Sequence, residues 1–286
     1  MERNVLIQSP PEKQSLSVGE LLRKRINVDE QGIDNLTFKI AETQNELESA
    51  YRLIHDTYVK SGYMNPSPSG LRFGFFNAMP YTQTFLGKRN AETILTISLF
   101  PDSLLGLPLD KLYKKEIDTL RAKGRYVAEV GTLASVVNNQ NAIMHIIKLM
   151  YYCAKELLKI DDLVSTVHPK HKNFYKSILC FEEIGEIKSY SNVNNNPAVA
   201  LRLDLNRFRE YYWNFYPREP LEKDIHHFFF IKKSGLILPP ESKYPPRIWN
   251  TELFNYFFMK KTNMYFEADD KAKKLMEEYY GESVYA

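Results

Sequence analysis

The sequence predicts an α/β fold of the α+β type, in which a mixed β-sheet carries helices on both of its faces. Segments with the two-residue alternation of strands are interleaved with segments of helical periodicity across residues 36–205. Their order is β-α-β-β-α-β-α-β-α-β-β, and helices that connect strands in this way pack onto both faces of a sheet. Hydrophobic residues make up 44% of the 286 residues, enough for a core of this size.

The first half of this region predicts a strand, a helix, a loop and two further strands. Thr43 and Glu46 have the spacing of a capping box at a helix N-terminus. The loop is rich in glycine, proline and serine, which is typical of a long loop or lid. The five elements are expected at Leu36–Ala41, Thr43–Val59, Ser61–Phe76, Tyr81–Leu86 and Thr93–Phe100, with a turn at Gly87–Ala91.

The second half predicts three helices that alternate with strands and a closing hairpin. Apolar residues recur at helical spacing between Asn141 and Leu158, so this helix is amphipathic and packs on the sheet. The expected helices are Leu109–Ala122, Asn141–Leu158 and Lys172–Leu179, and the expected strands are Tyr126–Val137, Leu163–Val167, Phe181–Tyr190 and Ala198–Leu205.

Composition divides the chain into three parts. Residues 1–35 form a polar N-terminal segment with one short helix near Val18–Arg25, residues 36–205 form the main domain, and residues 206–286 form a helical C-terminal extension. The extension holds more than half of the aromatic residues. We expect these rings to pack on the core, and the alternative is that some contact lipid at a membrane surface.

Charge and cysteine content exclude several classes of protein. A net charge of +3 is too small to indicate a nucleic-acid partner. Cys153 and Cys180 are too few for a disulfide framework and are typical of reduced, buried thiols. The N-terminal residues lack the apolar stretch of a signal peptide, and no window approaches the ~18 apolar residues of a membrane span. We therefore expect a cytoplasmic protein.

Searches for local motifs narrow the chemistry further. The chain contains no Cys-x-x-Cys, no His-Glu-x-x-His, no P-loop and no Gly-x-Gly-x-x-Gly. It also lacks the Gly-x-Ser-x-Gly elbow of serine hydrolases. The sequence therefore predicts no metal site and no nucleotide cofactor of these types.

Glu129 is the strongest candidate for a catalytic base, because it lies within the apolar strand that begins at Tyr126. A carboxylate there must be paired or face a cleft, since burying it unpaired is costly. Partial burial raises the pKa of a carboxylate toward that of a useful base. The alternative is a structural ion pair with an arginine such as Arg52 or Arg125.

Three neighbouring positions are weaker candidates. Gly131 permits a bulge that exposes backbone N–H groups near Glu129. His168 ends the next strand, where a side chain reaches the same cleft, and His55 lies on the first helix of the domain. The alternative for each histidine is a hydrogen-bonded structural role, which is the more common role of a lone histidine.

A series of short motifs, in order and correctly spaced, resembles the long-chain N-acyl amino acid synthase family. This family is related to the acyl-homoserine-lactone autoinducer synthases within the GNAT superfamily, and the resemblance covers about Leu36 to Leu205. The motifs are Tyr51–Val59 with Gly62-Tyr63, Phe76–Pro80 with Thr82 and Thr84-Phe85, Ser98–Ser103, Gly106–Pro108, Leu112-Tyr113, Glu116, Leu120-Arg121, Gly124-Arg125, Ala128–Val130, Leu133-Ala134, His168-Pro169, His171, Phe174-Tyr175 and Phe181.

The resemblance implies a GNAT-like, mostly antiparallel central sheet and the transfer of a fatty acyl group to the amine of an amino acid. Glu129 matches a position at the active cleft of the family, and Arg52 matches an arginine of the first helix. The autoinducer synthases carry an arginine three residues after the glutamate, where this chain has Thr132. This departure argues against lactone synthesis.

Tyr175 is the second catalytic candidate. GNAT enzymes typically carry a tyrosine a few residues before a Gly-Phe pair, and here Tyr175 precedes Cys180-Phe181. A phenol with a pKa of about 10 suits protonation of a departing thiolate. The alternative is a tyrosine that only packs on its helix.

The donor is predicted from a missing loop. The chain has no glycine between Gly131 and Gly185, where most GNAT enzymes carry the glycine-rich loop that holds coenzyme A. We therefore expect no bound cofactor and an acyl-phosphopantetheine thioester supplied by an acyl carrier protein. Two basic clusters could dock this acidic partner through charge complementarity: Lys111, Lys114, Lys115, Arg121, Lys123 and Arg125, and Lys170, His171, Lys172 and Lys176.

The expected mechanism assigns one role to each candidate. Glu129 accepts the proton of the acceptor amine, N–H groups near Leu133 and Ala134 hold the oxyanion, and Tyr175 protonates the thiolate. The loop that includes Phe76 covers the acceptor, and Arg52 binds its carboxylate. Aromatic residues of the extension are alternative walls of an acyl-chain tunnel. The alternative functions are a coenzyme A-dependent acetyltransferase and a non-catalytic module that binds an acyl carrier or lipid.

Overall fold

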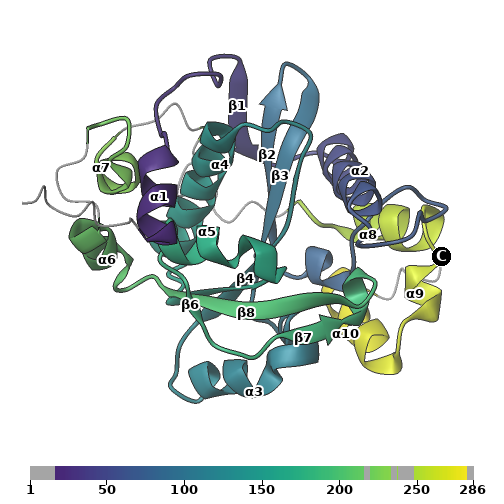
Figure 1. The fold of residues 1–286 in the computed structure, drawn as a ribbon. Helices are drawn as coiled ribbons and strands as arrows, with labels where there is room; N and C mark the ends of the chain where they lie inside the picture. Colours follow the sequence, from purple (N-terminus) through teal and green to yellow (C-terminus); the bar gives the residue numbers. More distant parts are fainter. Residues whose placement is uncertain (1–16, 216–219, 233–236, 238–247, 282–286) are drawn as a thin grey trace, which may run out of the picture.

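One sheet of eight strands forms the centre of the molecule (Figure 1). The computed structural model describes residues 17–215, 220–232, 237 and 248–281, and the remaining parts of the expected terminal segments lie outside the described residues. The strands are β1 Leu36–Ile40, β2 Gln83–Arg89, β3 Glu92–Pro101, β4 Val127–Ser135, β5 Asp162–Val167, β6 Glu182–Glu183, β7 Lys188–Tyr190 and β8 Asn196–Asp204.

The strand order is β1-β2-β3-β4-β5-β8-β6, and β7 also pairs with β8. Every pairing is antiparallel except that of β4 with β5, which is parallel. The one parallel pair lies at the middle of the sheet, and the chain between its two strands forms a helix, as a parallel crossover requires. The predicted mixed, mostly antiparallel sheet is therefore confirmed.

Helices cover both faces of the sheet, as the sequence predicted. Phe85 packs with the helices on one face and its neighbour Leu86 with those on the other, because successive strand residues point to opposite sides. The helices are α1 Val18–Arg25, α2 Gln44–Lys60, α3 Asp110–Arg121, α4 Gln140–Tyr152, α5 Lys172–Ser177, α6 Phe208–Phe215, α7 Ile225–Phe230, α8 Thr251–Asn255, α9 Met264–Glu267 and α10 Asp270–Tyr280.

The C-terminal helices separate onto opposite faces (Figure 1). α6 and α7 share the apolar core of α4, whereas α8 and α10 share the core of α2. The rings of Phe228, Phe254, Phe257 and Phe258 are all fully buried. The expectation that the aromatic residues of this segment pack on the core is therefore confirmed for these rings.

Two strand predictions differ from the structure. A turn was expected at Gly87–Ala91, but β2 continues through Gly87 to Arg89. Gly87 has no side chain, and this lets Leu95 of β3 pack directly against it. The expected strand Phe181–Tyr190 is broken into β6 and β7. Between them Gly185 lies against the ring of Tyr113, whose hydroxyl donates 2.8 Å hydrogen bonds to the carbonyls of Glu186 and Ala198.

Two helix predictions also need adjustment. Thr43 caps α2 by accepting the Glu46 N–H at 3.2 Å, but the Glu46 carboxylate accepts the N–H of Glu42 instead of returning to Thr43. The helix expected up to Leu158 does reach this region, but its last turn, Cys153–Leu157, is a π-helix.

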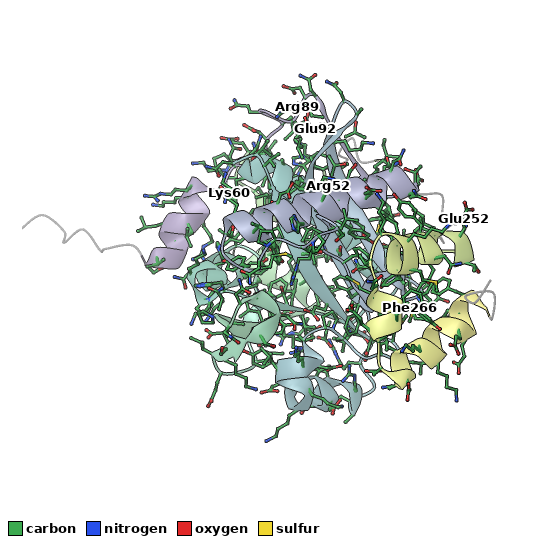
Figure 2. The ribbon with its side chains drawn as sticks, turned by 90° about the vertical axis from the view of Figure 1, so that its right-hand side faces the viewer. Arg52, Lys60, Arg89, Glu92, Glu252 and Phe266 are labelled. Atoms are coloured by element: carbon green, nitrogen blue, oxygen red, sulfur yellow. The ribbon has the colours of Figure 1, made fainter. Side chains whose placement is uncertain are left out.

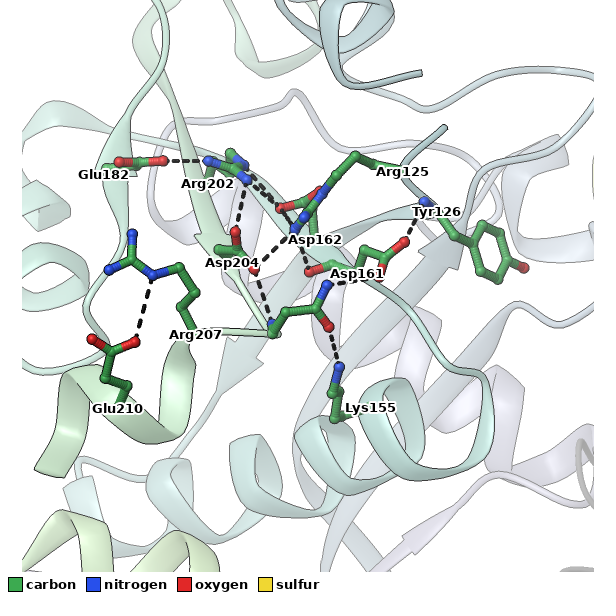
Figure 3. Close-up of polar contacts among 11 residues, drawn as sticks. Arg125, Tyr126, Lys155, Asp161, Asp162, Glu182, Arg202, Asp204, Arg207 and Glu210 are labelled. Carbon is green, nitrogen blue, oxygen red and sulfur yellow. Dashed lines mark hydrogen bonds and ion pairs between the residues drawn. The ribbon is translucent and has the colours of Figure 1, made fainter. Parts of the chain in front are cut away.

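An ion network ties together one end of β4, β5 and β8 (Figure 3). The fully buried carboxylate of Asp162 accepts from Arg125 and from Arg202, at 2.9 Å from the Arg202 Nε. Asp204 bonds both guanidinium groups in turn, at 2.9 Å from Arg125 and 3.2 Å from Arg202. Because a buried carboxylate needs such partners, these strands are fastened at this end.

Candidate active site

β4 and β5 part in the middle of the sheet. Their parallel ladder pairs Val127, Ala128 and Glu129 with residues 162–164 and then ends, although both strands continue. The ion network of Asp162 holds the paired end, so the strands form a fork that opens beyond Glu129. A fork of this kind leaves backbone groups of β4 available to a ligand.

A β-bulge follows Glu129 on the other edge of β4. Ser98 pairs with Gly131 and Thr96 with Ala134, so two residues of β4, Thr132 and Leu133, stand opposite a single residue of β3. Thr132 has a φ of 54°, an unfavourable left-handed conformation for a β-branched residue. Strained backbone of this kind persists where the surrounding structure imposes it, and it concentrates at functional sites. The bulge that Gly131 was expected to permit lies one residue after it.

Glu129 lies at the start of the fork and is buried, with 5% of its surface exposed. Its Oε2 accepts the backbone N–H of Leu109 at 2.7 Å. Burial raises the pKa of Glu129 to about 8, while the Leu109 hydrogen bond opposes the shift and the charge of Asp110 adds to it. No ion pair to Arg52 or Arg125 was found for this carboxylate, and both arginines have other carboxylate partners.

Two tyrosines from different elements lie close enough to this carboxylate to be affected by its charge, and a third lies close to one of them. Burial raises the pKa of Tyr58 on α2 and raises that of Tyr190 on β7 to about 12, and the charge of Glu129 contributes to both shifts. Burial also raises the pKa of Tyr175 on α5 to about 12, with a contribution from Tyr58 and an opposing hydrogen bond to Ser165. The phenols are therefore protonated at neutral pH and can donate hydrogen bonds in the fork.

Arg72 supplies a positive charge beside these phenols. Its guanidinium lies 4.7 Å from the centroid of the Tyr58 ring and donates to the carbonyl of Asn192 at 3.0 Å. Its charge also lowers the pKa of Tyr190 against the effect of burial. Arg72 comes from the loop between α2 and β2 and is only partly exposed, so it is the arginine that the structure brings to the cluster.

Arg52, the arginine expected to bind the acceptor, lies on α2 apart from the cluster of Tyr58 and Arg72 (Figure 2). Its side chain is 53% exposed and pairs with Glu48 at 3.2 Å, one helical turn away. Glu48 also accepts from Tyr256 and Lys261 of the C-terminal helices, at 2.5 and 3.1 Å. Arg52 therefore belongs to a surface network that joins α2 to the C-terminal helices.

The two histidines have different surroundings. His55 is buried, and its Nε2 accepts the N–H of Ser67 at 3.1 Å, so it anchors the loop after α2. His168 follows β5, and its Nδ1 accepts the N–H of Lys170 at 3.1 Å. The His168 ring lies 6.3 Å from that of Tyr63, which makes an edge contact with Tyr58. His168 is thus near the open end of the fork.

The remaining predicted residues lie around the fork and its loop. The side chain of Ala134 is buried on the α2 face of the sheet, while the side chain of Leu133 packs on the α4 face. Phe76 is half-buried in the 3₁₀ turn Phe75–Ala78, and its carbonyl accepts from the Thr82 hydroxyl at 2.8 Å. Phe75, the residue before Phe76, anchors the start of this turn, because its ring stacks on Phe258 with the ring centroids 4.9 Å apart.

A small apolar cavity lies on the α4 side of the fork. Its volume is about 20 Å³, and its walls include Val130 of β4, Leu163 of β5 and Met150 of α4. Tyr175 lines one part of this cavity and so joins it to the tyrosine cluster around Glu129.

The N-terminus of α4 is covered by the chain that precedes β1. The Asn139 side chain caps the helix by accepting the N–H of Ala142 at 3.1 Å, and its amide donates to the carbonyl of Gly32. Asn141 donates to the carboxylate of Asp29 at 2.9 Å. A helix N-terminus binds phosphate through free N–H groups, and here the Asn139 cap takes one of them while the Asp29 carboxylate lies beside the first turn through its bond to the Asn141 side chain.

Two searches of the described residues bear on other functions. None of their clusters of histidine, cysteine, aspartate or glutamate has three or more members placed to hold a metal ion. None of their helices is both long enough and apolar enough to cross a membrane.

The comparisons with known proteins decide the family. A family model described as N-acyl amino acid synthase FeeM matches residues 49–204, more than half of the chain. The chain belongs to this N-acyl amino acid synthase family. Members of the family are acyltransferases, so the predicted enzyme class and the predicted relationship are confirmed.

One solved structure of this family is similar to the chain, and two further structures are similar at lower identity. The structure of FeeM, an N-acyl amino acid synthase from uncultured soil microbes, is 28% identical, with a TM-score of 0.55 over 61% of this chain and 94% of that chain. The AHL synthase LasI is 15% identical, with a TM-score of 0.44 over 60% of this chain and 90% of its own. BjaI, a CoA-dependent acyl-homoserine lactone synthase, is 14% identical, with a TM-score of 0.45 over 67% of this chain and 87% of its own. No curated protein sequence gives a significant match.

Sequence reasoning missed three residues of this candidate site. Tyr58 and Tyr190 lie near Glu129 and come from a helix and a short strand that are far apart in the chain, and Arg72 reaches Tyr58 from a loop. Tyr58 offered one signal, since it follows the apolar positions of α2 within a motif of the family. Tyr190 and Arg72 stand in segments without periodicity, so only the fold brings them together.

Proposed function

We propose that this N-acyltransferase moves a fatty acyl group from the thioester of an acyl carrier protein to the amine of an amino acid. The observation that carries the proposal is the position of the buried Glu129 carboxylate beside two protonated phenols, where β4 and β5 part. A carboxylate with a raised pKa can accept a proton from an amine, and the fork gives an extended thioester access to it.

The reaction requires one proton acceptor and one proton donor. The neutral amine attacks the thioester carbonyl, the C–N bond forms, the C–S bond breaks, and the products are an amide and a thiol. Glu129 takes the proton that the amine loses, directly or through water. Tyr175 donates its proton to the departing thiolate, and its raised pKa keeps the phenol protonated until then.

The oxyanion of the tetrahedral intermediate needs hydrogen-bond donors at the bulge. β4 has no ladder partner on its β5 side beyond Glu129, and the left-handed Thr132 turns the following backbone. The N–H group of Leu133, within the bulge, is therefore our proposed oxyanion donor. The N–H group of Ala134, the second donor expected from the sequence, lies at a hydrogen-bonded position of the ladder with Thr96 of β3, since the next such position bonds the Val136 N–H to the Ile94 carbonyl. His168, at the open end of the fork, is proposed as a secondary contact to the donor.

The acceptor carboxylate is assigned to Arg72 in place of Arg52. Arg72 lies against Tyr58 beside the cluster around Glu129, whereas Arg52 is paired with Glu48 on the outer face of α2. A guanidinium bonds a carboxylate in two places and so fixes the direction of the amine. Phe76 and the loop of Arg72 then cover the bound acceptor.

The covered N-terminus of α4 supports a donor without a nucleotide. The Asn139 cap takes one N–H group that a pyrophosphate would need, and the Asp29 carboxylate beside the first turn of α4 repels a phosphate. The pantetheine of a carrier protein ends in a phosphodiester to protein and needs no such cradle. Carrier docking falls to exposed lysines such as Lys115 and Lys123, since Arg121 and Arg125 are committed to internal ion pairs.

Overexpression followed by mass spectrometry of lipid extracts tests the function. New N-acyl amino acids are expected with the wild-type chain and with Glu92→Gln, a change at the exposed first residue of β3, but not with Glu129→Gln. If the wild-type chain yields no new amide, the enzyme proposal is wrong, and a module that only binds the acyl carrier is favoured. Assays of the purified protein then distinguish the two possible acyl donors. Rapid turnover of acyl-CoA together with saturable binding of free CoA would contradict the proposal that an acyl carrier protein is the donor.

A further inference from the structure

The cavity beside the fork ends against the C-terminal helices. Its walls near the fork come from the sheet and α4, whereas its remaining wall includes Phe208 of α6 and Phe229 of α7. These two rings pack edge to face with their centroids 5.5 Å apart. Both are buried, with 2% and 6% of their surfaces exposed.

The cavity begins where the acyl transfer is proposed to occur. Tyr175 lines the cavity, bonds Ser165 of β5 and is electrostatically coupled to Tyr58, which faces Glu129. A thioester carbonyl held in the fork therefore has this cavity beside it. The walls of the cavity are almost entirely apolar, which suits an alkyl chain and no charged group.

The size of the cavity shows that a wall must move. A volume of about 20 Å³ holds roughly one water molecule, far less than the tail of a fatty acyl chain. Strands and α4 are fixed by the sheet ladder and the central core, so they yield least. α6 and α7 are short helices at the edge of that core, and α7 has only six residues.

We propose that Phe208 and Phe229 form the end wall of the acyl site and set the longest acyl chain that the enzyme accepts. This inference rests on the proposed acyl transfer. Both residues lie outside the part of the chain that matches the family model, residues 49–204. The extension therefore adds a chain-length determinant to the family fold.

Acyl-length profiles of single variants test the proposal. The probes are acyl carrier proteins loaded with saturated chains from octanoyl to hexadecanoyl, with transfer measured at each length. Phe229→Ala and Phe208→Ala are each expected to move the preferred length upward by about two to four carbons, as atoms leave the end wall. Phe229→Leu keeps most of the packing and is expected to give a smaller shift in the same direction.

Phe228→Ala is the matched control. Phe228 is the neighbouring residue of α7 and is fully buried, and its ring packs on His145 and edge to face on Phe229, but it does not line the cavity. The same truncation there is expected to lower thermal stability while leaving the preferred length unchanged.

The outcomes separate the two proposals. If the wild-type enzyme transfers no chain from any loaded carrier, the proposed function fails. If the wild-type enzyme is active but the Phe229→Leu, Phe229→Ala and Phe208→Ala profiles all coincide with it, the end-wall proposal is overturned. An equal shift in Phe228→Ala also overturns it, because general loosening of α7 then explains the effect.

Discussion

The Ser165 hydroxyl donates to the backbone carbonyl of Val130 at 2.9 Å, across the fork and just beyond the last paired residues of β4 and β5. Ser165 is 3% exposed, so this bond spans the fork in a dry environment. The same hydroxyl lies beside the Tyr175 phenol and lowers its pKa against the effect of burial. One buried serine therefore links the position of the proposed acid to the geometry of the fork.

Ser165→Ala is expected to impair the proposed acid without removing it. We expect kcat to fall about tenfold, while Tyr175→Phe lowers it by about a hundredfold or more because the proton donor is lost. The double variant is expected to match Tyr175→Phe, since the serine acts through the phenol. Steady-state kinetics of the four proteins measure this, with Ser189→Ala at an exposed position as control. Additive losses in the double variant would show that Ser165 does not act through Tyr175.

Activity is expected to follow the ionisation of Glu129. Its pKa of about 8 means that the carboxylate is mostly protonated at neutral pH and becomes a competent base as the pH rises. The value of kcat/KM for the wild type is therefore expected to increase with pH and to level off above about 8. Glu129→Gln is expected to lose about a hundredfold or more in kcat/KM and to lack this inflection. A wild-type profile without an inflection near 8 contradicts the assignment of Glu129 as base.

The same residue predicts an opposite dependence for stability. An unfolded glutamate has a pKa of about 4.3, whereas the folded value is about 8, so the folded protein holds an extra proton between these values. The contribution of Glu129 to the free energy of unfolding therefore falls as the pH rises through this window and is constant above it. Glu129→Gln has no such proton, and its amide oxygen can still accept the Leu109 N–H. Urea unfolding of both proteins is expected to favour the glutamine variant increasingly toward pH 8; a constant difference would contradict the raised pKa.

Local patterns in the sequence predicted most of the fold because they report directly on burial. The β4 segment and α4 have strong periodicity, and both form near their expected bounds. The single strand expected at Phe181–Tyr190 fails because the chain bends at Gly185 around the buried ring of Tyr113, which lies 185 − 113 = 72 residues earlier in the sequence, so no local pattern contains this contact.

The candidate site was predictable only where a residue carries its own chemical signal. A glutamate in an apolar strand must be explained, and Glu129 does lie in the fork with a raised pKa. An arginine on a helix or in a loop has no such signal, so the family motif directed attention to Arg52 while the fold brings Arg72 to Tyr58. The roles of these residues, and the three-part division of the chain, stay predictions.

Exchange of the two arginines for lysine tests the acceptor assignment. A lysine keeps the charge but loses the two-point fork, so Arg72→Lys is expected to raise the KM for the amino acid by roughly tenfold to a hundredfold, with a smaller change in the KM for the acyl donor. Arg52→Lys retains a cation for Glu48 and is expected to leave both constants near their wild-type values. If instead Arg52→Lys raises the KM for the amino acid and Arg72→Lys does not, then Arg52 binds the acceptor carboxylate, as first inferred from the sequence.

Cys180 takes the position at which the family resemblance led us to expect glycine, and its backbone explains why glycine suits the position. Its φ is 57°, in the left-handed region that costs an L-residue about 1–2 kcal/mol relative to glycine. Cys180→Gly and Cys180→Ala both remove the thiol, so their comparison isolates the backbone. Glycine is expected to be more stable than alanine here by about 1 kcal/mol, the reverse of the order in an ordinary helix or strand. Thermal and urea unfolding of the two variants measure the difference, and an alanine variant equal to or more stable than the glycine variant shows that Cys180 is not strained.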